Sequence, residues 1–407
     1  MPMVTLSEAE LIFTQVWFRH GERAPSHFRR FPNEATDFGK DFPIENGELT
    51  MKGRMMEYTI GQTLRTRYDN FIGEEYKPHQ IRIYFDSDNR TAECAQLVAA
   101  GLFPPSGEQI WNTKLLWQPL AIHEELILKH TSFSMLGTCP KAGKTIKNSK
   151  EFQNILRKVD PNFIDFLKSK TLVKDVPNAQ ALNELVDSLY TRVKINDSRL
   201  AAPSWVTREI YEKLDETTNF LHTSFMNLTR LTSGNWHVDR VLNEFHQHLS
   251  RPTDLKNKIV LFSGHDTNLM TIGREIGLKE VGVRLPDFGG HLLLELHKIS
   301  DELYVQAWFA SFYLAELKEQ TFELCGNPCR FERFVELYGS RKYSDEQWWD
   351  YCRGWIQADN RDNSTIAWFI VALIVLLLID VFLLYKCLTA RRAMQRNPEL
   401  KPLLDPE

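Results

Sequence analysis

Short apolar runs, separated by long stretches of mixed polarity, predict the buried strands of a sheet. The runs are rich in aromatic and β-branched residues, which pack well on a buried, pleated surface. Two of them, residues 291–297 and 303–309, lie close together in the sequence and predict a hairpin. The three main runs are residues 11–18 (LIFTQVWF), 81–85 (IRIYF) and 259–262 (IVLF).

Helical patterns fill most of the chain between the main runs. One pattern extends from Thr50 to about Tyr68, a second covers residues 91–101, and a third ends near Ile276. Strands that alternate with helices indicate an α/β fold with an open, mostly parallel sheet flanked by helices. Residues 111–250 contain further helical patterns with polar connectors, and we expect a mainly helical insertion there.

The length of the chain also favours a divided globular part. About 360 of the 407 residues precede the C-terminal tail, and a single hydrophobic core stops growing at about 250–300 residues. We expect a discontinuous α/β domain that carries the chemistry, formed by residues 11–110 and 251–352 and interrupted by the helical insertion. The remaining segments are a linker (353–365), a transmembrane helix (366–385) and a basic cytosolic tail (386–407).

The transmembrane prediction rests on an apolar stretch about as long as a bilayer-spanning helix. Residues 366–385 read IAWFIVALIVLLLIDVFLLY, with one carboxylate at Asp380. Asp380 lies near the end of the stretch, where its charge can reach the headgroups. The alternative is a buried core helix, but fourteen unbroken apolar residues and a basic tail favour a membrane span. A glycolipid-anchor signal would have to end the chain.

The basic residues around this helix predict its orientation. More of them follow the helix than closely precede it, so the tail belongs in the cytosol and residues 1–365 outside or in a lumen. That topology needs a signal peptide, and residues 1–10 show none. Either the sequence lacks its true N-terminus, which we favour, or the helix is a tail anchor of a cytosolic domain. The following basic residues are Lys386, Arg391, Arg392, Arg396 and Lys401.

Composition excludes one class of partner and agrees with a secretory location. The formal net charge is −4, and the scattered basic residues give no polyanion-binding surface, so nucleic acid is not an expected partner. N-x-S/T sequons occur at Asn89, Asn196, Asn227 and Asn363. Among the six cysteines, spacing alone leaves the connectivity open: Cys325 with Cys329 and Cys139 with Cys352 are possible bridges, which would leave Cys94 free and Cys387 at the membrane edge.

Polar, phosphate-compatible loops follow each of the three main strands. Their sequences are RHGERAP (19–25), DSDNRT (86–91) and GHDTN (264–268). In open α/β sheets ligands bind at the carboxyl ends of the strands, so loops about 245 residues apart can meet in one crevice. Any one loop alone is explained at least as well as a solvated turn or a helix cap. Three of them at equivalent strand ends indicate a site, and arginine forks suit phosphate oxygens.

These loops resemble the signatures of the histidine acid phosphatases. Residues 19–25 resemble the RHGxRxP motif, and His265-Asp266 resembles the family's HD motif. The similarity covers nearly all of residues 11–352 and includes the DNRT turn and the glycines Gly53 and Gly61. With its C-terminal anchor, the chain is most similar to the lysosomal and prostatic branch.

The resemblance implies roles that the chemistry of these residues permits. His20 would be the nucleophile, which forms a phosphohistidine that water later hydrolyses. Asp266 would protonate the departing alcohol. Neighbouring arginines disfavour a charged His20 and Asp266 needs acid to hold a proton, so we expect an acidic optimum. The phosphate ligands would be Arg19, Arg23, Arg90 and His265, with no metal or other cofactor.

The resemblance also implies covalent and cellular features. It pairs Cys139 with Cys352 and Cys325 with Cys329, leaves a third bridge of the branch without counterparts, and implies a homodimer. Asn89 stands where the family usually has Asp, and a glycan there would block the crevice, so we expect Asn89 to be unmodified. We expect glycans at Asn196, Asn227 and Asn363 on a single-pass type I protein of lysosomes, endosomes or the cell surface.

Other functions explain the motifs less well. A strand metal site at His291, Glu295 and His297 lacks a fourth ligand, and a metal-dependent HD phosphohydrolase should carry its HD pair on a helix. From a different class, the chain could be a catalytically silent phosphate-binding ectodomain that acts as a receptor or scaffold. The intact set of candidate residues favours a phosphatase acting on a small phosphate monoester, although the sequence does not identify that ester.

Overall fold

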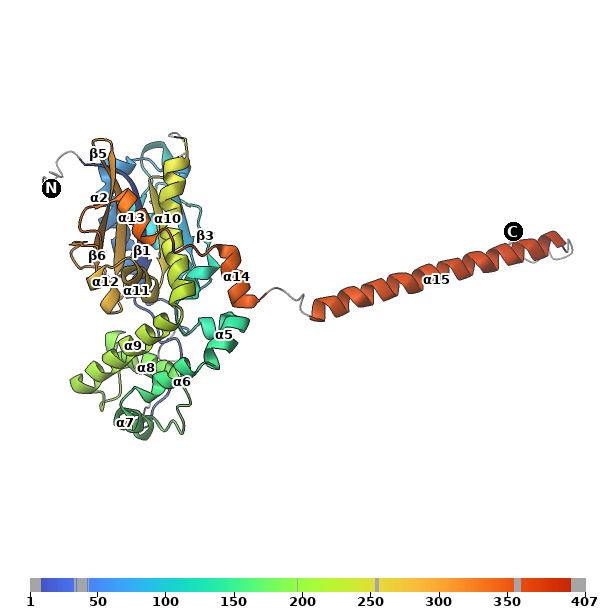
Figure 1. Cartoon of the computed structure of the whole chain (residues 1–407), viewed down its shortest axis with the longest axis horizontal. Coiled ribbons are helices and arrows are strands. Elements are labelled where there is room, and N and C mark those ends of the chain that lie inside the picture. Colours follow the sequence, from blue (N-terminus) through green and yellow to red (C-terminus); the bar gives the residue numbers. More distant parts are fainter. Residues whose placement is uncertain are drawn as a thin grey trace. The chain divides into compact units, whose positions relative to one another are not determined.

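The computed structural model describes residues 9–32, 34, 42, 44–195, 197–252, 256–354 and 360–396, with the side chains of 360–370, 372 and 393–396 excepted. The chain forms two compact units, Met1–Arg353 and Gly354–Glu407. The first unit contains the sheet and most of the helices (Figure 1). The sequons Asn196 and Asn363 lie outside the described residues and side chains.

The first unit is built on one mixed sheet with the strand order β3-β2-β4-β1-β5-β6-β7, and β8 also pairs with β6. The strands β3, β2, β4 and β1 run parallel, whereas β5, β6 and β7 continue the sheet antiparallel. The predicted α/β class and the predicted hairpin are confirmed, and the antiparallel hairpin makes the sheet mixed. The strands are β1 (Glu10–Arg19), β2 (Ile81–Phe85), β3 (His123–Glu124), β4 (Ile259–Gly264), β5 (His291–Ile299), β6 (Glu302–Ala310), β7 (Lys318–Gln320) and β8 (Cys329–Arg330).

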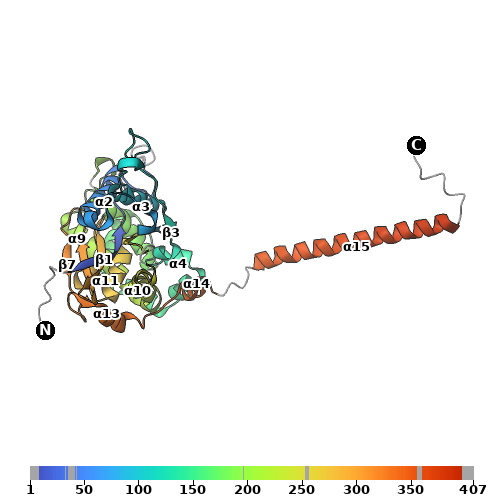
Figure 2. The same cartoon turned by 90° about the horizontal axis from the view of Figure 1, so that it is seen from above.

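Helices cover both faces of the central strands, which explains why these strands are mostly apolar. Figure 2 shows α2 (Met51–Ile72) and α3 (Asn89–Leu102) on one side of β1, with α10 (Asn235–Ser250) and α11 (Asp266–Glu275) on the other. Successive side chains of a strand point to opposite faces. Accordingly Val16 packs in the core under α2 and α3, while Trp17 packs in the core under α10 and α11.

Helices also make up the regular structure between β3 and β4. They gather at one end of the sheet, except α10, which lies along its face (Figure 1). The described elements of this segment are η4 (Leu126–Lys129), α4 (Met135–Thr138), α5 (Pro140–Lys147), α6 (Lys150–Arg157), α7 (Pro161–Thr171), α8 (Ala179–Ile195), η5 (Ser198–Leu200), α9 (Arg208–Leu228), the π-helix η6 (Arg230–Gly234) and α10. The shorter helices elsewhere in the unit are η2 (Pro78–Gln80), η3 (Gly107–Gln109), α12 (Lys279–Val283), α13 (Phe331–Tyr338) and α14 (Asp345–Arg353).

Strand register brings the three polar loops to one edge of the sheet. Arg19, the last residue of β1, pairs with Gly264, the last residue of β4. Phe85, the last residue of β2, pairs with Ser263 on the other side of β4. Because these three strands are parallel and end at the same level, the segments that follow them emerge side by side.

Two disulfides are present, with the pairing that the family resemblance implied. Cys139 bonds to Cys352 across 213 residues, and Cys325 bonds to Cys329. Cys94 is free and buried, and burial raises the pKa of its thiol well above the ordinary value. The long bridge ties α14, at the end of the first unit, to the beginning of α5.

We expect the two bridges to contribute unequally to stability. Loop-closure entropy grows with loop length, so removing the Cys139–Cys352 bridge with two serines should cost about 2–5 kcal/mol of unfolding free energy. The matched pair Cys325→Ser and Cys329→Ser opens a much shorter loop and should cost less. Denaturant titration of the full chain measures both losses. Peptide mapping that linked Cys94 to any of these four cysteines would contradict the assignment.

The second unit contains one long helix, α15 (Asn360–Arg396). Among the described residues, Leu373–Arg392 is the one stretch long and apolar enough to cross a membrane, with a mean hydropathy of 2.3. The helix begins inside the expected linker and continues into the expected basic tail. The described side chains of its apolar stretch, such as Leu377 and Leu384, are exposed, as a lipid-facing helix requires.

Candidate active site

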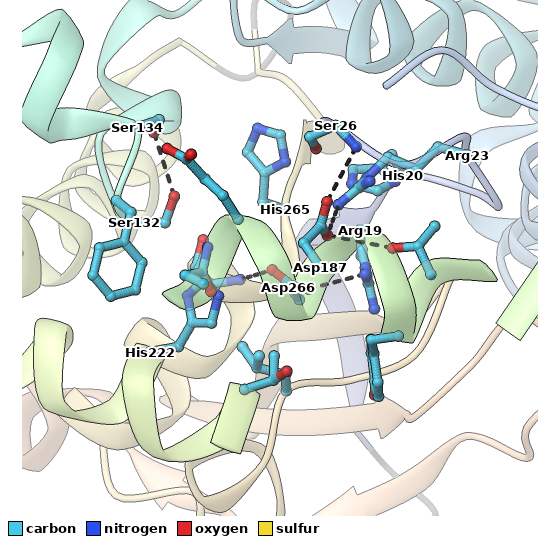
Figure 3. Close-up of a pocket in the computed structure, with 18 of the residues that line it drawn as sticks. Arg19, His20, Arg23, Ser26, Ser132, Ser134, Asp187, His222, His265 and Asp266 are labelled. Carbon is cyan, nitrogen blue, oxygen red and sulfur yellow. Dashed lines mark hydrogen bonds and ion pairs between the residues drawn. The ribbon is translucent and has the colours of Figure 1, made fainter. Parts of the chain in front are cut away.

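A pocket of about 230 Å³ opens where β1, β2 and β4 end. Its floor comes from the loops that follow these strands, and its walls come from the helical segment between β3 and β4 (Figure 3). The rings of His20 and His265, 245 positions apart, meet with centroids 5.4 Å apart. The structure therefore brings together all six candidate residues, which are Arg19, His20, Arg23, Arg90, His265 and Asp266.

His20 is held in one orientation and in one protonation state. Its backbone N–H donates to the carbonyl of Gly264 at 3.0 Å, and its ring Nδ1 lies 2.9 Å from the carbonyl oxygen of Gly21. A carbonyl only accepts, so Nδ1 carries the proton and Nε2 of the neutral ring is the free base. Burial, together with Arg90, Arg19 and Arg23, lowers the pKa of His20 well below its ordinary value. The ring can therefore act as a nucleophile in acid.

The loop after β1 is fixed by the beginning of α2, and two glycines permit the close approach. A Cβ at Gly21 would lie 2.3 Å from the carbonyl oxygen of Gly53, and a Cβ at Gly53 would lie 2.0 Å from the carbonyl oxygen of Glu22. Thr50, which caps α2, donates from its hydroxyl to the Glu22 carboxylate at 2.9 Å. Lys52 completes this anchor at 2.8 Å from the same carboxylate. Side chains at these glycines would push the nucleophile loop away from the helix.

Arg19 and Asp266 form a buried pair below the pocket. Nη2 of Arg19 lies 3.0 Å from Oδ2 of Asp266, and Nη1 donates to the carbonyl of Pro286 at 2.6 Å. The guanidinium also stacks 4.5 Å above the ring of Phe288. Burial opposes ionisation of Asp266, but Arg19, His222, His265 and Arg23 outweigh it and lower the pKa of the carboxyl. Without a bound phosphate, the ionised form of Asp266 is therefore favoured more strongly than in an ordinary aspartate.

Arg23 is held by a carboxylate that the sequence did not single out. Nη2 of Arg23 lies 2.9 Å from Oδ1 of Asp187, which comes from α8 (Figure 3). The other oxygen of Asp187 accepts from the backbone N–H of Ser26 at 3.1 Å. Asp187 thus connects the helical segment to the C-terminal part of the nucleophile loop and to the residue that follows it. No local pattern distinguishes Asp187 from the other polar residues of α8, so only packing identifies it.

Arg90, in the first turn of α3, contacts Asp88. Nη2 of Arg90 lies 2.5 Å from Oδ2 of that carboxylate, and Nζ of Lys129 lies 2.5 Å from Oδ1. Asn89 is exposed beside them and its amide donates to Glu48 at 3.3 Å. Arg90 therefore reaches the pocket as predicted, with a carboxylate and a second cation beside it.

His265 is oriented by the buried carboxylate of Asp86. Its Nε2 contacts Asp86 Oδ2, and its backbone N–H donates to the side-chain oxygen of Asn268 at 2.7 Å. Thr91 and the N–H of Asp88 also donate to Asp86, and together with His265 they lower the pKa of this carboxyl despite its burial. With Nε2 engaged, Nδ1 is the ring nitrogen left for a ligand.

His222 of α9 is a further pocket residue that the sequence patterns did not indicate. It lines the cavity near Asp266 (Figure 3), and its ring packs against Phe133 with centroids 5.4 Å apart. Burial lowers its pKa, against the opposing effect of Asp266 and Asp187. The imidazole therefore contributes a polar edge to the pocket wall beside Asp266.

Among the described residues, two groups of side chains are close enough to share a metal ion. In both groups, some of the possible ligand atoms are already bonded to other partners. Asp86, Asp88 and His265 place ligand atoms within 4.8 Å of one another. Asp88, however, is occupied by Arg90 and Lys129, which a cation would have to displace. The second group consists of His130 with the two cysteines of the long disulfide, whose sulfurs are not thiolates.

Comparison with known proteins agrees with this geometry. The family described as "Histidine phosphatase superfamily (branch 2)" matches residues 10–310. Prostatic acid phosphatase of Bos taurus is 29% identical over 340 residues, which cover 81% of this chain and 84% of that protein. Lysosomal acid phosphatase of Xenopus laevis is 26% identical over 93% of this chain and 87% of its own length. Among solved structures, the apo form of Hafnia alvei phytase covers 85% of this chain and 99% of its own, with a TM-score of 0.57 at 14% identity, which is a likeness of fold.

Proposed function

Because the chain belongs to branch 2 of the histidine phosphatase superfamily, we propose that it hydrolyses phosphate monoesters through a phosphohistidine on His20. Relatives with similar sequences include prostatic and lysosomal acid phosphatases. The observation that carries the proposal is the state of His20. The residue is 2% exposed, and its neutral ring is oriented by the contact of Nδ1 with the Gly21 carbonyl. Three arginines surround the ring. A buried imidazole with an unprotonated nitrogen, surrounded by arginines, is suited to attack a phosphoryl group.

In the first step, Nε2 of His20 forms a bond to phosphorus while the bond from phosphorus to the ester oxygen breaks. Arg19, Arg23, Arg90 and His265 would contact the phosphoryl oxygens and offset the charge that spreads over them. Asp266 would donate its proton to the leaving oxygen, which departs as an alcohol. In the second step, water attacks phosphorus, Asp266 takes the proton of that water, and free phosphate and neutral His20 result.

The pKa shifts predict activity in acid. The pKa of His20 is lowered, so the ring stays neutral as the pH falls below the usual histidine pKa of about 6.5. The pKa of Asp266 is lowered in the free site, which opposes protonation, but the negative charge of a bound phosphate raises it, and the protonated fraction then grows as the pH falls. Activity on an ester that needs the acid should therefore rise from neutral to acid pH and decline only when His20 itself protonates.

A direct assay tests this function. We expect the full chain to release phosphate from phenyl phosphate and p-nitrophenyl phosphate at about pH 5, faster than at about pH 8, and equally with and without chelator. Loss of turnover with chelator would indicate a metal-dependent hydrolase instead. Phosphate binding without any turnover would indicate a silent receptor or scaffold.

We further propose that α15 anchors the protein in a membrane with the first unit in a lumen or outside the cell. Support comes from the apolar stretch Leu373–Arg392, the basic residues at and after its C-terminal end, the two disulfides and the similarity to a lysosomal acid phosphatase. Disulfides persist in oxidising compartments. Lysosomal or endosomal residence and the homodimer implied by the resemblance stay predictions.

The topology predicts a glycan on Asn227. This side chain is exposed near the end of α9, with its Oδ1 accepting from Arg274 at 2.6 Å. In cells that express the chain behind a working signal peptide, glycosidase should reduce its mass, and Asn227→Gln should remove part of that reduction. Asn89→Gln should change nothing, because a glycan there would obstruct the pocket. A glycosidase-insensitive protein whose first unit is digested from the cytosolic side would contradict the topology.

A further inference from the structure

Asp88 occupies a helix N-cap position but does not cap the helix. It precedes the first turn of α3, where an aspartate side chain ordinarily accepts from a backbone N–H of that turn. Here the side chain makes no such bond, and the carboxylate lines the pocket instead. The Thr91 hydroxyl bonds to the Asp88 carbonyl at 2.8 Å. The usual structural reason for an aspartate at this position is therefore absent.

The Asp88 carboxylate forms ion pairs with two cations, whereas Asp266 and Asp187 each form an ion pair with one pocket arginine. Arg19 pairs with Asp266 and Arg23 with Asp187. Asp88 contacts Arg90 through one oxygen and Lys129 through the other, both at 2.5 Å, and its Oδ2 lies 3.6 Å from Nε2 of His265. Lys129 ends η4 and is the one cation of this group to which the proposed reaction gives no task.

Lys129 lies next to the expected position of the transferred phosphoryl group. One carboxylate links it to Arg90, a proposed ligand of the transferred phosphoryl group, so the ammonium is adjacent to that group's position. Its side chain is 24% exposed and lines the same pocket, so it is accessible from the entrance. A free lysine in this position would bind a neighbouring phosphate through a charge-assisted hydrogen bond. Asp88 neutralises the lysine and engages its ammonium group, so the attraction for a second phosphate is lost.

We propose that Asp88 is a specificity-determining residue that restricts the enzyme to substrates with a single phosphate group by occupying Lys129. The proposal rests on the proposed phosphatase function and deepens it. Specificity of this kind comes from an unfavourable element directed at the wrong ligand. The rest of the pocket wall agrees with a polar, singly phosphorylated substrate, since it presents hydroxyl and amide groups from Ser26, Ser132, Ser134, Gln180 and Asn183.

The experiment compares fructose 1,6-bisphosphate with fructose 6-phosphate, which differ by one phosphate group. Asp88→Asn keeps the size of the side chain and an acceptor for Arg90 but removes the charge that holds Lys129. We expect the ratio of kcat/KM for the bisphosphate to that for the monophosphate to rise about tenfold or more, because a charge-assisted bond becomes available. Adding Lys129→Met to Asp88→Asn should return the ratio to that of the parent.

Two controls separate this effect from a general change of charge or of fold. Asp165→Asn removes an exposed carboxylate of α7, outside the pocket, and should leave the ratio unchanged. Thermal unfolding of each variant checks that it is folded. An unchanged ratio in Asp88→Asn, or a rise that persists when Lys129 is replaced, would overturn the proposal.

Binding measurements test the role of Asp88 even if the protein has no phosphatase activity. Calorimetric titration with pyrophosphate and with inorganic phosphate needs no turnover. The affinity for pyrophosphate relative to phosphate should increase about tenfold in Asp88→Asn and not in the double variant. A parent protein that hydrolyses neither the aryl phosphates nor the sugar phosphates would refute the phosphatase function, while the pyrophosphate ratio would still support or refute the role of Asp88.

Discussion

The His20→Ala variant should lose turnover of every phosphate monoester, by a factor of about 10⁴ or more, because the covalent route disappears. The described pocket offers no equivalent base in the same position. The ring of His265 is held through Nε2 by Asp86, and His222 lies on the wall beside Asp266. The loss should therefore be as large for activated esters as for poor ones.

Intermediate trapping measures the same property directly. The parent, quenched in base during turnover, should carry a base-stable phosphohistidine on the peptide that contains His20, and the His20→Ala variant should carry none. His246→Ala is the matched control, since it removes an exposed imidazole of α10 outside the pocket. Label recovered on a different histidine would assign the nucleophile elsewhere.

The Asp266→Asn variant should separate substrates by their leaving groups. Phenyl and alkyl phosphates leave poorly without a proton, so their turnover should fall by about a hundredfold or more. The anion of p-nitrophenol is stable, so p-nitrophenyl phosphate should lose much less. Phosphohistidine should still form on His20, because the asparagine leaves the nucleophile and the arginines in place.

Asp187→Asn provides the comparison for Asp266→Asn. Both substitutions remove the negative partner of a pocket arginine. Asp187, however, contacts Arg23 and the backbone of Ser26, so its effect on turnover should be to position the nucleophile loop. Asp187→Asn should therefore lower turnover of both kinds of ester by similar factors. The role of Asp266 is falsified if its variant behaves in the same uniform way with substrate binding unchanged. The pair Arg19–Asp266 would then be structural.

Local sequence patterns determined the parts of this protein that depend on neighbours along the chain. Strands β1 and β4 of the α/β sheet were predictable because both of their faces are buried, which makes their sequences mostly apolar. The candidate residues His20, Arg90 and His265 were recognisable because each follows the carboxyl end of such a run. The apolar stretch of α15 was equally plain, since spanning a bilayer fixes both its length and its polarity.

Tertiary structure alone decided which charges hold the site in place. Asp187 and His222 come from helices whose periodic patterns report only which face is buried, not which pocket that face meets. Asp86 and Asp88 were visible in the loop, but their division between His265 and the two cations Arg90 and Lys129 depends on strand register and side-chain direction. These partners are set by distances between segments as far as 179 residues apart in the sequence, and local periodicity carries no information about those distances.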